Sequence, residues 1–218
     1  MLRLGWQHLA LLLVAAVAVP VDAAAQARLE VGPVFGGYIP VASYGPSNAF
    51  STSLPAKPGD LGAVAWGAEA RLWLTRRIGI GFLGAVATSR FGGGLVVPCM
   101  SPPAVCSPTP PNHATIATGA AQVLFRPAAR GPLTVSAGFG LVRHGGDAYE
   151  SFNAPTPLAG VCGVGLDLPL ARNLRAALGV TALIYGLDVR DWQGMRFEHG
   201  TQMDLLPHLS LTWTTHPT

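Results

Sequence analysis

One short pattern in the sequence matches a nucleotide-binding motif. Gly79, Gly81 and Gly84 have the spacing G-x-G-x-x-G, in which the glycines open a helix and an acidic residue follows about 20 positions later. No acidic residue stands at that distance, and the glycines lie in a segment of alternating residue types. We therefore interpret them as small residues on the inner side of a narrow structure, which excludes a nucleotide site.

The pair His208 and Ser210 is a second candidate for chemistry. The two residues lie two positions apart, so they share one face of a strand. A base beside a nucleophile is the arrangement that activates serine, but a hydrogen-bonded interior histidine explains the pair equally simply. No H-E-x-x-H, G-x-S-x-G or Walker pattern is present.

Oxygen and nitrogen ligands for a metal gather only near the end of the chain. Asp188, Asp191, Glu198 and His199 lie in one segment, but their spacing matches no calcium-binding loop. We interpret the segment as a solvated loop and predict neither a metal nor another cofactor.

The composition limits the class of protein that could hold these residues. Of the 218 residues, 50% are hydrophobic and only 11% are charged, against roughly 25% charged in soluble domains. The formal net charge is +3, with no basic run, which argues against nucleic-acid binding. Such a chain would expose a large apolar surface in water.

The first 27 residues have the features of a secretory signal peptide. Arg3 precedes an uncharged apolar run from Leu9 to Val21, and Ala25-Gln26-Ala27 supplies an A-x-A cleavage pattern. The run is too short for a transmembrane helix, which needs about 20 apolar residues. We predict a signal peptide at 1–27 and one exported domain at 28–218.

Apolar residues alternate with small or polar residues through the exported domain. No segment after residue 27 suits a spanning helix, and a closed β-barrel is then the remaining way to cross a bilayer. In 133–143, for example, Leu133, Val135 and Ala137 share a face opposite Thr134 and Ser136. The eight predicted strands are 29–39, 64–74, 78–88, 114–126, 133–143, 159–169, 174–187 and 203–213.

The connections between these strands alternate in length. Short ones are predicted at 75–77, 127–132 and 170–172, and long ones at 40–62, 90–113, 144–158 and 188–201. Outer-membrane barrels have short periplasmic turns and long outer loops. We predict an all-β, antiparallel up-and-down transmembrane barrel with its apolar residues outside. The opposite sense of alternation would describe a soluble lipocalin-like barrel.

On these strands and connections, residues 28–218 resemble the small eight-stranded outer-membrane barrel proteins of Gram-negative bacteria. The resemblance implies location in the cell outer membrane, contact with its lipids, and a monomer. One family of lipid A deacylases, also eight-stranded, uses a His-x-Ser pair followed by Asn and a small residue. Leu211 and Thr212 follow here, and alternation turns His208 to the lumen, away from lipid.

The cysteines suggest one covalent bond outside the membrane. Cys99 and Cys106 flank six residues in a proline-rich connection, and an exported protein meets an oxidising compartment. We predict a disulfide between them, because no histidine or third cysteine stands at metal-ligand spacing. Cys162 falls on the apolar face of its strand.

Four charged residues fall on the predicted lumen side near the periplasmic end. They are Glu30, Arg71, Asp167 and Arg175. A hairpin centred on Ala171 would place Asp167 directly opposite Arg175, where opposite charges stabilise a strand pair. We predict that this cluster closes that end of the barrel.

The sequence therefore predicts a non-enzymatic barrel with a structural or surface-binding role. Its outer loops would contact extracellular or envelope ligands. A narrow pore for small solutes is the alternative, because the glycines and alanines of the lumen face leave some room. A lipid-modifying enzyme is a third, weaker possibility.

Overall fold

The computed structural model describes residues 27–41, 62–91, 112–129, 131–146, 152–153, 156–191 and 196–214. Nine β-strands account for most of these residues. No helix in these ranges is long and apolar enough to cross a membrane. The strands are β1 (Arg28–Pro40), β2 (Ala63–Trp73), β3 (Ile78–Phe91), β4 (Asn112–Phe125), β5 (Leu133–Gly145), β6 (Phe152–Asn153), β7 (Leu158–Ala171), β8 (Leu174–Asp191) and β9 (Arg196–Thr214).

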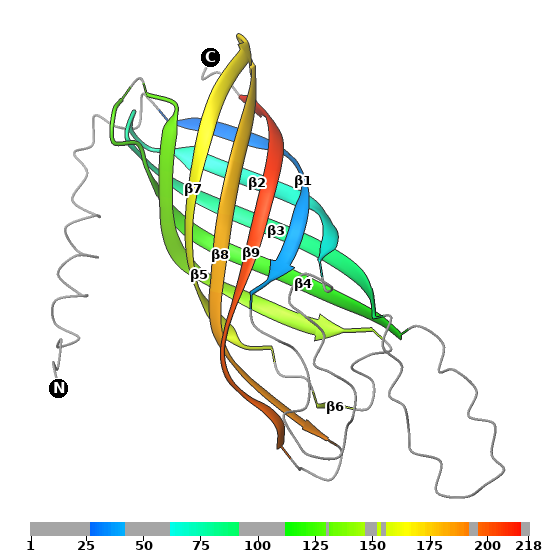
Figure 1. Ribbon diagram of the computed structural model, residues 1–218. Coiled ribbons are helices and arrows are strands. Elements are labelled where there is room, and N and C mark those ends of the chain that lie inside the picture. Colours follow the sequence, from blue (N-terminus) through cyan, green and yellow to red (C-terminus); the bar gives the residue numbers. More distant parts are fainter. Residues whose placement is uncertain are drawn as a thin grey trace, which may run out of the picture.

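Eight of the strands form a closed antiparallel barrel (Figure 1). Going around the wall, the order is β8, β7, β5, β4, β3, β2, β1 and β9, and β9 pairs with β8 to complete the ring. The two-residue β6 pairs with the far end of β8 and is not part of the ring. The predicted fold class and number of barrel strands are confirmed.

The short turns all lie at one end of the barrel. This end also holds the start of β1 and the end of β9, at the top of Figure 1. The turns join β2 to β3, β4 to β5, and β7 to β8, as predicted. We call this end the turn end and the opposite one the loop end.

The predicted loop at 188–201 is wrong. β8 continues to Asp191, β9 begins at Arg196, and the two strands remain paired as far as Arg190 and Arg196. Two strands joined by a hairpin can continue their backbone hydrogen bonds beyond the barrel wall without a core behind them. The polar residues of this segment suggested a loop, although the segment forms a regular β-ladder.

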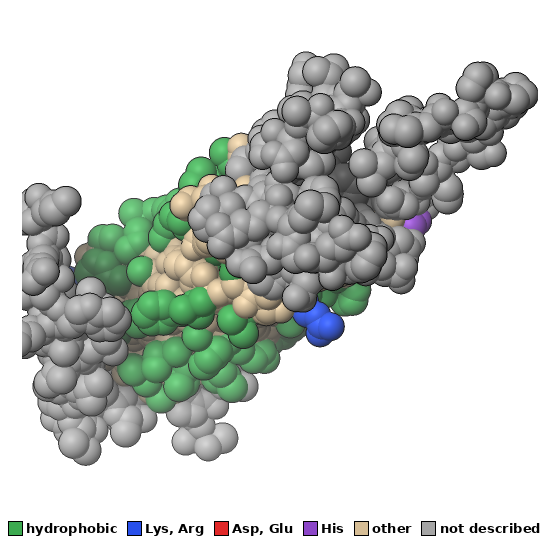
Figure 2. Space-filling view, turned by 90° about the horizontal axis from the view of Figure 1, so that it is seen from below, with side chains coloured by type: hydrophobic (Ala, Val, Ile, Leu, Met, Phe, Trp, Pro, Cys, Tyr) green, Lys and Arg blue, Asp and Glu red, His purple; other side chains and the backbone are tan. Residues whose placement is uncertain are grey.

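The outer wall is apolar. Large hydrophobic side chains from every barrel strand point outward, among them Phe35, Trp66, Phe82, Phe139 and Leu178, which are 57–61% exposed. Figure 2 shows hydrophobic side chains over much of the described surface, with one small basic region at its edge. This alternation is that of a membrane barrel, with its apolar side toward lipid.

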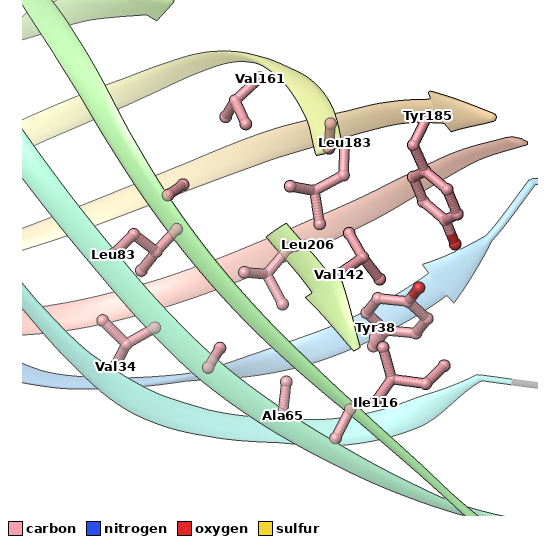
Figure 3. Packing of buried hydrophobic residues seen from close by; sticks show 14 residues of the cluster. Val34, Tyr38, Ala65, Leu83, Ile116, Val142, Val161, Leu183, Tyr185 and Leu206 are labelled. Carbon is pink, nitrogen blue, oxygen red and sulfur yellow. The ribbon is translucent and has the colours of Figure 1, made fainter. Parts of the chain in front are cut away.

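The interior is more apolar than predicted. Inward-facing side chains pack into one buried cluster at mid-height (Figure 3). Its large members escaped the alternation pattern because Leu83 and Leu206 follow residues that are themselves apolar. We restrict the name apolar layer to eight members of that cluster, which leaves out Tyr38 and Tyr185, because these two also belong to it but carry polar hydroxyl groups. The eight are Val34, Ala65, Leu83, Ala85, Ala120, Val161, Leu183 and Leu206.

Side chains from neighbouring strands fill the room beside the lumen glycines. A Cβ atom added to Gly81 would lie 3.1 Å from the Leu124 side chain, and one added to Gly179 would lie 3.1 Å from the His208 ring. The room beside these two glycines is therefore occupied by a neighbouring side chain.

Two predictions lie outside the described residues. They are nearly all of the signal peptide at 1–27, of which only residue 27 is described, and the disulfide between Cys99 and Cys106. Cys162 is described; it is a free cysteine on the outward face of β7.

Candidate functional site

Charged side chains meet inside the barrel at the turn end. Arg71 on β2 reaches across the lumen to Asp167 on β7, with 2.6 Å between Nη1 and Oδ1. Its Nε and Nη2 atoms also donate to Oε2 of Glu69, at 3.1 and 2.9 Å. β2 and β7 are diametrically opposite in the ring, so this ion pair joins the two walls directly.

Asp167 accepts two further hydrogen bonds. Arg126 Nη2 lies 2.7 Å from Oδ2, and Thr134 Oγ1 lies 2.8 Å from the same atom. The Arg126 guanidinium also stacks over the buried Trp73 ring, 3.7 Å from its centroid. Asp167, which is 2% exposed, therefore neutralises Arg126 and shares Arg71 with Glu69, at a depth where burial of an unpaired charge would be costly.

Glu30 forms the second half of the same region. Its side chain is fully buried and pairs with Arg28, and Nε of Arg175 lies 3.8 Å from its Oε1 atom. We call the whole set the charge cluster: Arg28, Glu30, Glu69, Arg71, Arg126, Asp167 and Arg175.

The structure brings the four predicted charges into this region but changes their partners. The predicted opposition of Asp167 and Arg175 is wrong, because Asp167 lies opposite Ala177, and Arg175 lies opposite Pro169. The hairpin turns at residues 172–173, and the register shifts between Pro169 and Ala171. Proline cannot donate to the ladder, and bulges accommodate such positions. The displacement is two residues, so both side chains keep the lumen face.

Sequence reasoning missed Glu69, Arg126 and Thr134 as members of the network. In the alternating pattern, each of them falls on the same side as the lumen-facing residues of its segment. This alternation was the signal that could have identified them. The alternation does not show how far along the barrel axis a residue lies relative to residues on the opposite wall.

A second polar group lies inside the loop end. Tyr38 on β1 and Tyr185 on β8 both donate to Oδ2 of Asp204 on β9. The Tyr185 hydroxyl also lies 3.3 Å from Nε2 of His144 on β5. β1 and β5 are opposite walls, so this chain of contacts, which we call the tyrosine cluster, spans the lumen. Figure 3 shows the two tyrosine hydroxyls directed toward each other.

The apolar layer separates the two polar clusters. The inward residues of β1 show the order: buried Glu30 at the turn end, then buried Val34, then buried Tyr38 toward the loop end. The cavity that remains beside the charge cluster has a volume of about 50 Å³ and is lined by residues such as Gln122, Ser136 and Thr181. This volume has room for one or two water molecules.

His208 and Ser210 do not form a catalytic pair. Both side chains are buried in the lumen, and His208 Nδ1 contacts the Leu206 carbonyl oxygen at 2.9 Å. The Ser210 Oγ atom has no hydrogen-bond partner among the described residues, so the imidazole does not contact the serine hydroxyl in this structure. The glycines at 79–84 lie within the continuous strand β3, which has no helix to hold a phosphate.

No set of three histidine, cysteine, aspartate or glutamate side chains in the described ranges could hold a metal ion. The chemistry that the described interior offers is therefore hydrogen bonding and ion pairing among its own residues.

No protein-family model matches the chain, and no curated protein matches it. Among solved structures, the outer membrane protein OprG from Pseudomonas aeruginosa superposes with a TM-score of 0.55 at 9% identity, over 87% of this chain and 96% of OprG. The outer membrane protein AlkL gives 0.49 at 14% identity, over 88% and 90% of the two chains. Ail of Yersinia pestis, crystallised with a heparin analogue, gives 0.47 at 10%, over 87% and 97%. The chain has the fold of the small outer-membrane barrel OprG.

Proposed function

We propose that the protein is a non-conducting, non-enzymatic barrel of the outer membrane that acts through the segments at its loop end. The observation that carries this proposal is the closed interior. Two polar clusters span the lumen at different heights, and the apolar layer fills the space between them.

The energetics favour a barrel that stays closed. An eight-stranded barrel is just narrow enough for side chains to fill it. Opening a path would separate Arg71 and Arg126 from Asp167, and breaking a buried pair of this kind costs about 3–5 kcal/mol. A path would also have to pass Val34, Leu183 and Leu206, each only 1% exposed.

An enzyme would need a nucleophile, a base and access for a substrate. The described lumen holds His208 and Ser210 without a hydrogen bond between them, and a cavity of about 50 Å³. The outward wall offers mainly hydrophobic side chains. The role of the protein therefore depends on contacts that it makes at the membrane surface.

The sequence supports the loop end as the place of these contacts. The segments 42–61 and 92–111 join consecutive strands at this end, and each is much longer than a turn of the opposite end. Extracellular or envelope ligands are the partners we propose for them. A heparin analogue accompanies Ail in its crystal, which makes sulfated polysaccharides a reasonable first probe.

Electrical recording in planar bilayers tests the closed interior. We expect the purified, folded protein to give no stable conductance steps. The double variant Arg71→Ala with Asp167→Ala removes the direct tie across the turn end and serves as the sensitised control, which we expect to show transient openings. Stable steps from the unmodified protein would overturn the proposal in favour of a pore.

Protease treatment of intact cells tests the orientation. We expect proteinase K to cut within 42–61 or 92–111 and to leave the exposed turn at Arg76 and Arg77 intact. Cutting at that turn in intact cells, while 42–61 and 92–111 survive, would contradict a loop end that faces outward.

A further inference from the structure

The outer wall contains a shallow groove of about 900 Å³, a volume typical of ligand sites. Its floor is a row of small outward-facing residues that lie side by side in successive strands. Pro33 pairs with Ala68, Ala68 with Gly84, and Gly84 with Gly119, and the row continues to Leu141.

Larger side chains border this floor. Val31 and Phe82 lie one outward position nearer the turn end and form one side of the groove. A Cβ atom added to Gly119 would meet no atom within 4 Å, and one added to Gly84 would meet only a backbone oxygen at 4.0 Å. The floor is therefore low because side chains are missing there and nothing from a neighbouring strand replaces them.

The groove runs obliquely along the height of the barrel. Trp213, near the last residue of β9, lines the part of the groove nearer the turn end. Leu158, the first residue of β7, lines the part nearer the loop end. An elongated, flexible, apolar ligand matches this shape.

One charged residue lies beyond the end of the groove that is nearer the loop end. Arg143 lies two residues after Leu141 in β5, on the same outward face, and is exposed. Among the acidic residues whose side chains the structure describes, none forms an ion pair with it. A phosphate at the membrane surface is a natural partner for such a guanidinium.

We propose that the groove binds an acyl chain of lipid A, the phosphorylated glycolipid of the outer leaflet, and that Arg143 binds its phosphate. This inference rests on the proposed placement in the outer membrane with the loop end outward. A second copy of the chain fits less well, because the acidic residues whose side chains the structure describes are buried inside the barrel, where Arg143 of another copy could not reach them. They are Glu30, Glu69, Asp167 and Asp204.

The test measures lipid retained by the folded protein. Protein extracted from outer membranes in mild detergent is analysed by native mass spectrometry, and delipidated protein is titrated with lipid A or with phosphatidylglycerol. We expect Gly119→Leu, which fills the floor, and Arg143→Gln, which removes the charge, each to lower lipid A binding roughly tenfold. Gly186→Leu on β8 is the matched control, because Gly186 is also exposed with open space around its Cβ position; it should bind as the unmodified protein does.

Three results would overturn the proposal. They are equal binding of lipid A by all variants, equal affinity for phosphatidylglycerol and lipid A, and a dimer of the unmodified protein that Gly119→Leu converts to a monomer. Heat-dependent gel mobility of each variant shows whether the barrel is folded. Failure of the unmodified protein to insert would contradict the proposed function, whereas an inserted barrel that does not select lipid A contradicts the groove alone.

Discussion

The two ends of the lumen bury polar groups in different ways. At the turn end, the charge cluster contains four arginines and three carboxylates, and Arg71 connects opposite walls through one ion pair with Asp167. At the loop end, the tyrosine cluster connects opposite walls through a chain of four side chains, in which Asp204 accepts from two hydroxyls. One end relies on charge neutralisation and the other on hydroxyl donors.

This difference determines what each end loses when one residue changes. Removing Asp167 leaves Arg126 without its ion-pair partner and Arg71 with Glu69 alone. Removing one hydroxyl leaves a carboxylate with its other donors. The cost of an unpaired buried charge exceeds that of one lost hydrogen bond. We therefore expect a graded series of effects, from the centre of the charge cluster to its rim.

The largest effect is expected for Asp167→Ala. Arg71 and Arg126 would lose their shared acceptor, and the free energy of unfolding should fall by about 3–5 kcal/mol, measured by urea titration in lipid vesicles. Thr134→Val is the matched control, because it removes only the neutral donor to the same oxygen and should cost about 1 kcal/mol. Equal effects of the two variants would show that charge pairing is unimportant at the turn end.

A smaller effect is expected for Tyr38→Phe at the loop end. The variant keeps the ring that packs in the interior and removes the hydroxyl that donates to Asp204. The loss should be about 1.5–3 kcal/mol, as for other hydrogen bonds to charged groups. The same unfolding titration measures it, and a loss above that of Asp167→Ala would reverse the comparison between the two ends.

Glu30→Gln should change stability by less than about 1 kcal/mol. Glu30 is buried, but its partners Arg28 and Arg175 keep 31% and 20% of their side chains exposed and can be hydrated when the charge is lost. The amide also preserves the shape of the site. A loss as large as that of Asp167→Ala would mean that the rim of the charge cluster is as dry as its centre.

The smallest energy is the coupling between Asp167 and Arg175. A double-mutant cycle with alanine should give a value near zero, within about 0.5 kcal/mol, because the two residues have different partners. The cycle for Arg71 and Asp167 is the positive control, with an expected coupling of about 1–3 kcal/mol. A strong Asp167–Arg175 coupling would support the register in which they face each other.

The sequence was sufficient to predict the barrel fold and the side of the wall to which each charged side chain points. Both follow from the two-residue period of a strand, which needs no knowledge of the partner strand. The pairing of Asp167 was not predictable in the same way. It depends on where the β7–β8 hairpin turns. The turn lies at residues 172–173, and a bulge beside Pro169 then shifts the register by one, so that the net displacement from the predicted pairing is two residues and the face is unchanged.

The filled lumen escaped prediction for a related reason. Where Leu83 follows Phe82 and Leu206 follows Leu205, both faces of the strand are apolar, so alternation gives no sign of a packed interior. Likewise, a glycine in the sequence suggests free space at that position of the lumen. Only the structure of the neighbouring strand shows that the His208 or Leu124 side chain occupies this space.

The closing ladder between β1 and β9 has a consequence for how the chain folds. Glu30 lies opposite Thr214, and Pro40 lies opposite Asp204, so this ladder joins residues far apart in sequence. The other barrel ladders, apart from that of β5 with β7, join strands that follow one another directly along the chain. Contacts between distant residues carry the largest loop-closure entropy and form late. Until they form, β1 and β9 each present an unpaired edge, which a bilayer does not tolerate. The first seven ladders can therefore form before the chain is stable in lipid. The barrel becomes stable in the bilayer only when β1 pairs with β9.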